Sequence, residues 1–274
     1  MQAEPNQPPP AAWQPFTARG VAAFAQARLG RLLTVQFLFA LLVAASVAWF
    51  LHHAWVPVLD DTVNRLPDQS EIRAGVLDWR AASPVLLAEN RFLAVAVDLD
   101  HTGQVRSPAH LCLELGRHDL RVYSLLGYLP VSYPTRLWIS LNRPAALPWW
   151  GAWMPVLLAL SAALTILVLF LAWAVLATLY TLPVWLVGFY ANRQLGLRAS
   201  WRLAGAALMP GALFMALMIL LHGLGAVDPL RLILALAAHL LIGWVYLWMS
   251  PLRVPHIPGA DLSHSNPFAT PGTT

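Results

Sequence analysis

The side chains best suited to chemistry follow an apolar run in the stretch AVAVDLDHTG. Asp98, Asp100, Thr102 and Gly103 have the spacing of positions 1, 3, 5 and 6 of a calcium-binding loop. Position 12 of such a loop is a bidentate Glu, but here it is Ala109, and a strand-like run precedes the loop where a helix is expected. The pattern therefore favours a strand that ends at Asp98 and a tight Asp/Gly turn after it.

The same stretch resembles the first motif of haloacid-dehalogenase-type phosphotransferases, Asp-x-Asp-x-Thr after a hydrophobic strand. The resemblance implies that Asp98 is a nucleophile and Asp100 a general acid/base. The family also needs a downstream Lys or Arg, further acids for magnesium and a longer, doubly wound fold, and this sequence does not show that pattern. We therefore predict no enzyme, no catalytic residue, no cofactor and no metal site.

Two histidines lie inside long apolar runs, where an ionisable side chain is costly and is by default a functional candidate. His239 lies near the centre of the last run, and His222 lies near the end of the run before it. The alternative for His239 is a neutral imidazole that shares a hydrogen bond with Ser161 or Thr165. No Asp, Glu or Lys lies at the same depth, which weighs against a proton or ion pathway.

Composition favours lipid as the surroundings of this chain. Hydrophobic residues make up 58% of the 274 residues and charged residues 11%, against roughly 25% charged residues in an average soluble domain. The net charge is only +4, and the arginines form no basic stripe, so we expect no nucleic-acid partner. Cys112 is the only cysteine, and we expect it to be a small buried side chain.

Four apolar runs are long enough for helices that cross a bilayer, which takes about 20 residues each. We predict a disordered and juxtamembrane segment over 1–31, a three-helix bundle over 151–250 and a disordered tail over 251–274. A stretch within the first segment, 16–31, could form a short helix at the membrane interface. The four predicted membrane-spanning helices are 32–53, about 153–177, 200–223 and 229–250.

Prolines are expected to shape the later helices. A straight helix over 153–190 would measure about 57 Å, roughly twice the hydrocarbon core. We predict that Pro183 bends an extension to 190 along the membrane surface, and a second crossing stays open. Pro210 should kink the third helix, and Asp228 with Pro229 should start the fourth.

Residues 54–150 form a polar segment between the first two crossings. They hold ten of the thirteen acidic residues and nine of the seventeen arginines. Helical spacing predicts a helix over Val56–Leu66, and alternation predicts a small α+β, mostly β, domain after it. The predicted strands are 93–97, 111–115, 120–125 and an edge strand over 136–141, with a hairpin turn at 116–119.

Arginine placement predicts the orientation of the helices. With four crossings, all Arg-rich flanks lie on one side, which the positive-inside rule assigns to the cytoplasm. Both termini are then cytoplasmic, residues 54–150 are extracytoplasmic, and a bacterial inner membrane is the expected location. The flanking arginines are Arg19, Arg28, Arg31, Arg193, Arg198, Arg202 and Arg253.

Small residues on the third helix predict close packing. Ala207 and Gly211 form one small-xxx-small pair, and Ala212 and Ala216 form another. Such pairs let helix backbones approach each other, either within one bundle or between copies in a homo-oligomer.

The order of the parts resembles a bacterial family of membrane proteins of unknown function, sometimes labelled maltodextrin-utilisation proteins. The features that carry the resemblance are the helical pattern Val56–Leu66, the strand and Asp turn Val95–Gly103, and the Arg-bearing loop before a Pro-containing helix, Arg193–Pro210. The resemblance implies a multi-pass protein without catalytic residues.

The sequence leaves three functional hypotheses from different classes. The first is a non-enzymatic anchoring or accessory protein whose outer domain binds a protein partner or an envelope component, with the lipid bilayer around its helices. The second is a component of a transporter, and the third is an enzyme that acts on phosphate esters. The candidate functional residues are His239, His222, Asp98 and Asp100.

Overall fold

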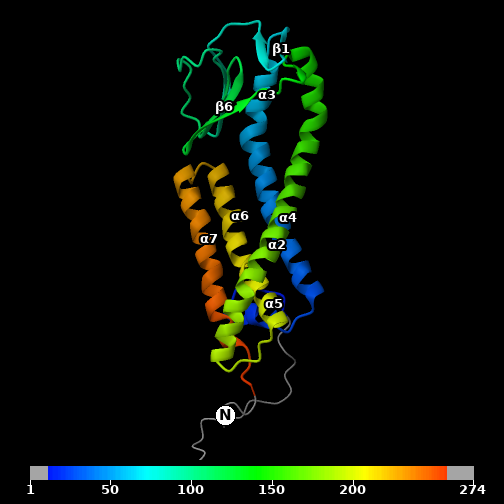
Figure 1. Cartoon of the computed structure of the whole chain (residues 1–274), viewed down its shortest axis with the longest axis vertical. Coiled ribbons are helices and arrows are strands. Elements are labelled where there is room, and N and C mark those ends of the chain that lie inside the picture. The colour runs from blue at the N-terminus through cyan, green and yellow to red at the C-terminus, as the bar shows by residue number, and fades with distance from the viewer. Residues whose placement is uncertain (1–11, 258–274) are drawn as a thin grey trace, which may run out of the picture. The chain divides into compact units, whose positions relative to one another are not determined.

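The computed structural model describes residues 12–257 (Figure 1). Helices and strands follow in the order α1, α2, the π-helical segment η1, α3, β1 to β8, α4 to α7 and the short 3-10 helix η2. Helices together with a β-sheet domain confirm the coarse fold class. Four helical stretches are long and apolar enough to span a membrane: Leu29–Asn64, Arg143–Tyr190, Leu197–Gly223 and Pro229–Arg253.

The chain divides into two compact units. The helical unit comprises Met1–Val43, Thr165–Leu217 and Ile233–Thr274, and the sheet unit comprises Ala44–Leu164 and Met218–Leu232. Each of the four long helical stretches contributes residues to both units.

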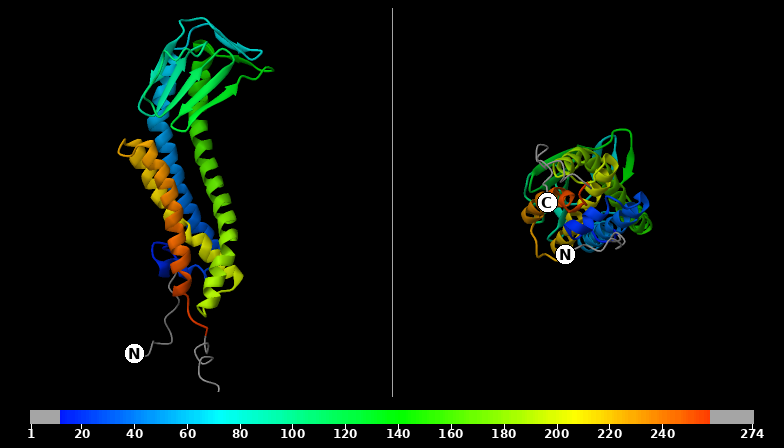
Figure 2. Two further views of the ribbon diagram at one scale, coloured as in Figure 1. Left: turned by 60° about the vertical axis from the view of Figure 1, so that its left-hand side comes forward. Right: turned by 90° about the horizontal axis from the view of Figure 1, so that it is seen from below.

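The sheet unit contains two β-sheets (Figure 2). The smaller, antiparallel sheet has the order β2-β1-β8, and the larger has the order β3-β4-β5-β6-β7, in which only β4 and β5 are parallel. The strands are β1 Ser70–Arg73, β2 Val76–Trp79, β3 Val85–Glu89, β4 Leu93–Val97, β5 Leu111–Leu115, β6 Asp119–Ser124, β7 Gly127–Ser132 and β8 Trp138–Ser140.

Alternation along the strands gives the larger sheet one apolar face. Leu93, Val95 and Val97 of β4 pack there with residues of α3 (Val56–Asn64) and of the smaller sheet. The strands predicted at β4, β5 and β6, the turn between β5 and β6, and the edge strand β8 are confirmed. β1, β2, β3 and β7 were not predicted, because their short or mixed sequences show little alternation.

The first apolar run continues without a break into the polar segment. α2 (Leu29–Phe50) is followed by η1 (Leu51–Trp55) and then by α3, which confirms the helix predicted from Val56. The helix ends at Asn64, shortly before Pro67, which cannot continue a helix.

α4 (Arg143–Tyr190) begins earlier than the predicted start at about 153. The side chain of Asn142 explains the early start, because its Oδ1 accepts a hydrogen bond from the Ala145 N–H at 3.0 Å, as an N-cap residue does. Pro144 in the first turn suits a helix start as well. The helix then runs through Pro183 to Tyr190.

The third apolar run is interrupted near Pro210, where a kink was predicted. α5 (Leu197–Ala207) and α6 (Met209–Gly223) are separated at Leu208. Pro210 explains the break, because it has no N–H to donate to the Ala206 carbonyl and its ring collides with that carbonyl in a helix.

Small residues bring α6 close to α7 (Pro229–Met249) within the helical unit. A methyl group built on Gly211 would lie 2.5 Å from the carbonyl oxygen of His239. Ala207, Ala212 and Ala216 are buried on the same helical stretch. The predicted close packing within the bundle is confirmed.

The arginine-bearing flanks of the helices meet in the helical unit. Arg202 donates to the carbonyl of Ala25 at 2.8 Å, and Arg193 donates to the carbonyl of Val254 at 2.9 Å. The segment around Ala25 includes α1 (Ala18–Ala23), the short helix expected within 16–31. The contacts join the N-terminal flank to α5 and the α4–α5 loop to the C-terminal flank.

The ends of the chain differ in part from the prediction of disorder. Residues 251–257 form η2 (Pro251–Arg253) and a β-bridge between His256 and Arg193. The burial of Val254, at 2% exposure, gives this segment an apolar anchor. The rest of the predicted disordered ends, 1–11 and 258–274, lies outside the described residues.

Candidate functional site

Asp98 closes the turn that follows β4. Its carboxylate is buried and accepts hydrogen bonds from the Thr102 hydroxyl and the Gly103 N–H, both at 2.9 Å. Burial alone would raise the pKa of Asp98, but the hydrogen bonds from Thr102 and Gly103 outweigh it and hold the pKa below its usual range. The predicted Asp/Gly turn is confirmed.

Asp100 has different surroundings from Asp98. Its side chain is exposed and forms an ion pair with Arg117, with 3.3 Å between the nitrogen and the oxygen. If Asp98 were a nucleophile and Asp100 its acid/base partner, both carboxylates would have to reach the same substrate. The carboxylate of Asp98 is instead hydrogen-bonded within its own turn. Within residues 12–257, no group of three or more His, Cys, Asp or Glu side chains is placed to hold a metal ion.

His101, which no sequence pattern indicated as a site residue, joins the β4–β5 connection to the sheet. Its Nδ1 lies 2.5 Å from Glu114 Oε1 and its Nε2 lies 2.7 Å from Asp119 Oδ1. Burial would lower the pKa of His101, but the hydrogen bonds to the two carboxylates raise it. Both ring nitrogens face carboxylate oxygens, so the charged imidazolium suits this position.

Gly116 makes room for His101. A methyl group built on Gly116 would lie 2.2 Å from His101 Nε2, far inside any contact distance. His101 itself adopts the left-handed region, at a φ of 53°. The ring is therefore held in place by its loop and by the two carboxylates, in the space that Gly116 leaves free. This arrangement is typical of a residue with a structural role.

His222 and His110 come together with two aromatic rings in the sheet unit. The imidazoles stack with their centroids 5.3 Å apart, and Phe50 and Phe92 lie against the His222 ring at 5.4 and 5.3 Å. His222 is buried and its Nδ1 lies 2.7 Å from the carbonyl oxygen of Val227. The predicted candidate His222 thus has a histidine partner that the sequence did not indicate.

His110 carries the less satisfied ring of this pair. Its buried Nδ1 has no hydrogen-bond partner in the part of the chain that the structure describes. Burial lowers the pKa of His110, and the nearby His222 and Arg91 charges add to that effect. A neutral imidazole is therefore the stable form.

An open cleft of about 460 Å³ lies beside His110. Cys112 lines it, and burial, with the charge of Glu114 next, raises the pKa of this thiol to about 11. The thiol is therefore protonated and a poor nucleophile at neutral pH. The remaining lining residues are Ser107, Pro108, Ala109, Tyr123, Ser124, Leu125, Asp228, Pro229 and Leu230.

His239 lies on α7 in the helical unit. Its Nδ1 bonds to the carbonyl of Leu236 in the same helix, and its own carbonyl lies against Gly211 of α6. His239 belongs to the helical unit, whereas His222, Asp98 and Asp100 belong to the sheet unit.

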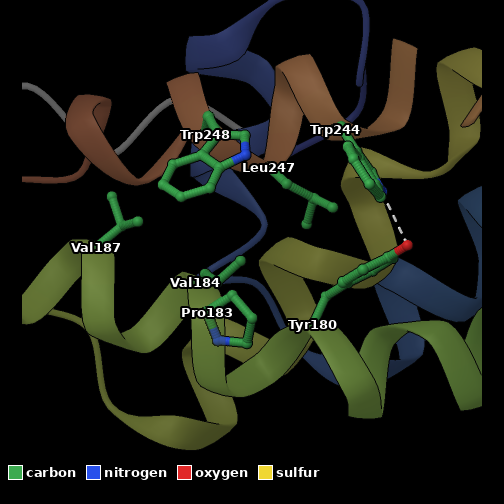
Figure 3. Close-up of a pocket in the computed structure, with 7 residues that line it drawn as sticks. All are labelled: Tyr180, Pro183, Val184, Val187, Trp244, Leu247 and Trp248. Atoms are coloured by element: carbon green, nitrogen blue, oxygen red, sulfur yellow. Dashed lines mark hydrogen bonds between the residues drawn. The ribbon is translucent and has the colours of Figure 1, made fainter. Parts of the chain in front are cut away.

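An apolar cavity of about 180 Å³ lies between α4 and α7 in the helical unit (Figure 3). Trp244 Nε1 donates to the Tyr180 hydroxyl at 2.9 Å, which joins the two helices beside the cavity. No charged side chain lines it, and its lining residues are Tyr180, Pro183, Val184, Val187, Trp244, Leu247 and Trp248.

β7 presents the most exposed apolar residues of the larger sheet. All six of its residues are exposed, including Leu129 at 62% and Val131 at 45%. Leu129 pairs with Val122 of β6, which pairs with Leu113 of β5, a residue that packs against the core. The core face of the sheet therefore continues to β7, where the described residues leave it uncovered.

Comparison with known proteins finds no family model, no curated protein and no solved structure that matches this chain. The resemblance to the bacterial membrane-protein family therefore stays a prediction from the order of the parts.

Proposed function

We propose that this chain is a multi-pass membrane protein that anchors an extracytoplasmic domain, and that this domain binds a protein partner. Under this proposal the protein is not an enzyme. Both termini are cytoplasmic, and residues 54–150 lie outside a bacterial inner membrane.

The exposed surface of α4 supports a lipid environment. Apolar side chains along this helix are largely uncovered, and only 6% of its most apolar window is buried. Contiguous apolar surface of this size is unfavourable in water and favourable in hydrocarbon. The uncovered residues include Leu157, Leu160, Leu164, Val168, Leu171 and Val175.

The joined arginine flanks support the proposed orientation. Arg202 reaches the backbone before α2, and Arg193 reaches the backbone after α7, so three flanks share one end of the helical unit. The positive-inside rule assigns an end rich in Arg to the cytoplasm. A reporter that is active only outside the cytoplasm tests this when fused after Ala145 and after Met249; activity at Ala145 alone is expected.

The observation that carries the proposed partner binding is the uncovered core face at β7. Leu129 and Val131 point to the face that Leu113 and Leu120 bury, so a partner there would extend an existing apolar core. Pro130 has no N–H, which weakens pairing of a further strand at this edge. We therefore propose that the partner docks on the side chains of β7.

Site-specific photocrosslinking in native membranes tests the partner. A benzophenone amino acid at Leu129 should give a crosslinked product of discrete, reproducible mass, and Val131→Asp should remove that product without lowering the amount of protein. The same probe at Asp78, which is exposed on β2, is the matched control. Equal crosslinking at both positions, or a product that survives Val131→Asp, would count against the proposed surface.

A transport component is the second proposal, because the third apolar run is broken at Leu208 and Gly211, shortly after the break, lies against His239 of α7. Broken helices at mid-membrane form the binding sites of many transporters. His239→Ala should then reduce solute or proton flux in proteoliposomes at least about tenfold, as expected for an intramembrane ionisable group. Unchanged flux and unchanged proton coupling would reject this second proposal and leave the anchoring role untouched.

A further inference from the structure

The turn between β6 and β7 presents two leucines at its tip. Leu125 is 61% exposed and Leu126 is 86% exposed, and they are the only residues between Ser124 and Gly127. The positive φ of this turn is at Gly127, at 116°, and not at either leucine, so the turn itself needs no particular side chain at positions 125 and 126. Turn geometry therefore does not explain a pair of exposed leucines.

Within the sheet unit, the tip of this turn lies close to the start of an apolar helix. Leu125 lines the same open cleft as Asp228, Pro229 and Leu230. Asp228 caps α7, since its Oδ1 accepts the Arg231 N–H at 2.8 Å, and α7 is apolar and long enough to cross a membrane. Within the sheet unit, Leu125 therefore lies beside the first turn of this helix.

Aromatic pairs lie behind the tip and on α4, both in the sheet unit. Tyr123 and Tyr128, the pair directly behind the tip, have their ring centroids 5.6 Å apart. In the same unit, Trp149 and Trp153 of α4 stack at 6.2 Å and are both largely exposed. Tyr and Trp concentrate where lipid headgroups meet the hydrocarbon, because their rings are apolar at one end and polar at the other.

We propose that the Leu125–Leu126 turn inserts into the lipid interface and holds the sheet domain against the bilayer. The inference rests on the membrane spans of the proposed function but not on the protein partner. Neither Leu125 nor Leu126 carries a charge, so the occupant is the apolar part of the leaflet and not an anionic headgroup. Insertion should therefore occur in phosphatidylcholine and depend little on salt.

Fluorescence quenching in reconstituted vesicles tests the depth of the tip. The full chain with Cys112→Ser receives one cysteine, which is labelled with an environment-sensitive fluorophore and placed in phosphatidylcholine vesicles. Leu126→Cys is the test position. Leu137→Cys, in a loop at 57% exposure, is the matched control on the sheet domain, and Leu164→Cys, on α4 at 59% exposure, is the control for the membrane span.

If the tip inserts, a nitroxide carried by the lipid should quench the label at position 126 at least about threefold more strongly than the label at position 137, as for a side chain in the interface. Iodide in water should show the reverse order. Equal behaviour at 126 and 137, or a label at 126 that neither quencher reaches, overturns the inference. If the label at 164 is also quenched only by iodide, the membrane span of the proposed function fails; if 164 is in lipid and 126 is not, only the tip insertion fails.

Discussion

β4 and β7 are strands of one sheet with opposite surroundings. All five residues of β4 are buried, and all six residues of β7 are exposed, although both strands are mostly apolar and neither contains a charged residue. The difference shows that apolar composition alone does not decide which strand becomes core; the parts of the chain that pack on the strand decide it.

Other parts of the chain pack on both faces of β4. α3 and the smaller sheet pack on one face of the sheet through the core that contains Leu93 and Val97. On the opposite face, the β4–β5 connection places His101 against Glu114, the residue that pairs with Ala96. β7 lies at the edge of the sheet, beyond these covers. We infer that its cover is supplied by a second molecule.

The largest expected difference comes from removing one leucine from each strand. Leu93 and Leu129 lie on the same face of the sheet, but Leu93 is 1% exposed and Leu129 is 62% exposed. Leu93→Ala should cost about 2–5 kcal/mol, because it leaves a cavity in the core. Leu129→Ala should change the free energy of unfolding by about 0.5 kcal/mol or less.

Limited proteolysis of the detergent-solubilised chain at increasing urea measures both effects on the sheet unit. Similar midpoints for the two variants would contradict the assignment of β7 as uncovered. A loss of photocrosslinking at Val131 in the Leu129→Ala chain, with a normal midpoint, would sharpen the contrast between a strand for stability and a strand for binding.

The second prediction concerns the cover on the opposite face. Gly116→Ala should destabilise the sheet unit by about 1–3 kcal/mol, because the added methyl group would overlap the His101 ring. In a chain that already carries His101→Ala, the same change should cost much less. A double-mutant cycle measures this coupling, and additive effects of the two substitutions would show that Gly116 is needed for another reason.

The sequence alone predicted strand β4, but it did not predict the contacts of His101 that cover one face of this strand. Leu93, Val95 and Val97 alternate and end at Asp98, so β4 and its turn could be predicted from local pattern. The partners of His101 lie beyond a long connection, in Glu114 and Asp119, and nothing in the spacing of these residues indicates that they meet. β7 escaped prediction because Gly127 and Pro130 interrupt its apolar residues.

The candidate site divides in the same way. His222 was predictable because an ionisable residue in an apolar run is conspicuous. Its partner His110 lies in an ordinary polar loop, and its role depends on a contact between the end of α6 and the β4–β5 connection. Contacts of this kind depend on tertiary packing, which a local pattern does not contain.

The third prediction separates two histidines by pH. The pKa of His101 is raised above the ordinary value of 6.5, so its pairing stabilises the fold fully below pH 6.5 and the contribution is lost as the pH rises through the raised pKa. The pKa of His110 is lowered, so its contribution is present above pH 6.5 and is lost as the pH falls toward the lowered pKa. Stability should therefore be greatest near pH 6.5.

Thermal unfolding of the chain between pH 5 and pH 8 measures the two contributions. His101→Asn should flatten the alkaline side and His110→Asn the acidic side, each by roughly 4 °C or less. If either variant flattens the opposite side, the assigned direction of that pKa is wrong.

The last prediction compares a covered and an uncovered thiol and changes stability least. Cys112 on β5 has a pKa of about 11 against an ordinary 9.0, so at pH 8 its thiolate should be about a hundredfold scarcer than that of a free cysteine. In the Cys112→Ser chain, Leu129→Cys on β7 should instead react with iodoacetamide nearly as fast as a free thiol. The two reaction rates are measured in detergent. A fast-reacting Cys112 would mean that the sheet beside His110 opens readily. A slow-reacting cysteine at position 129 would mean that β7 is already covered in the purified chain.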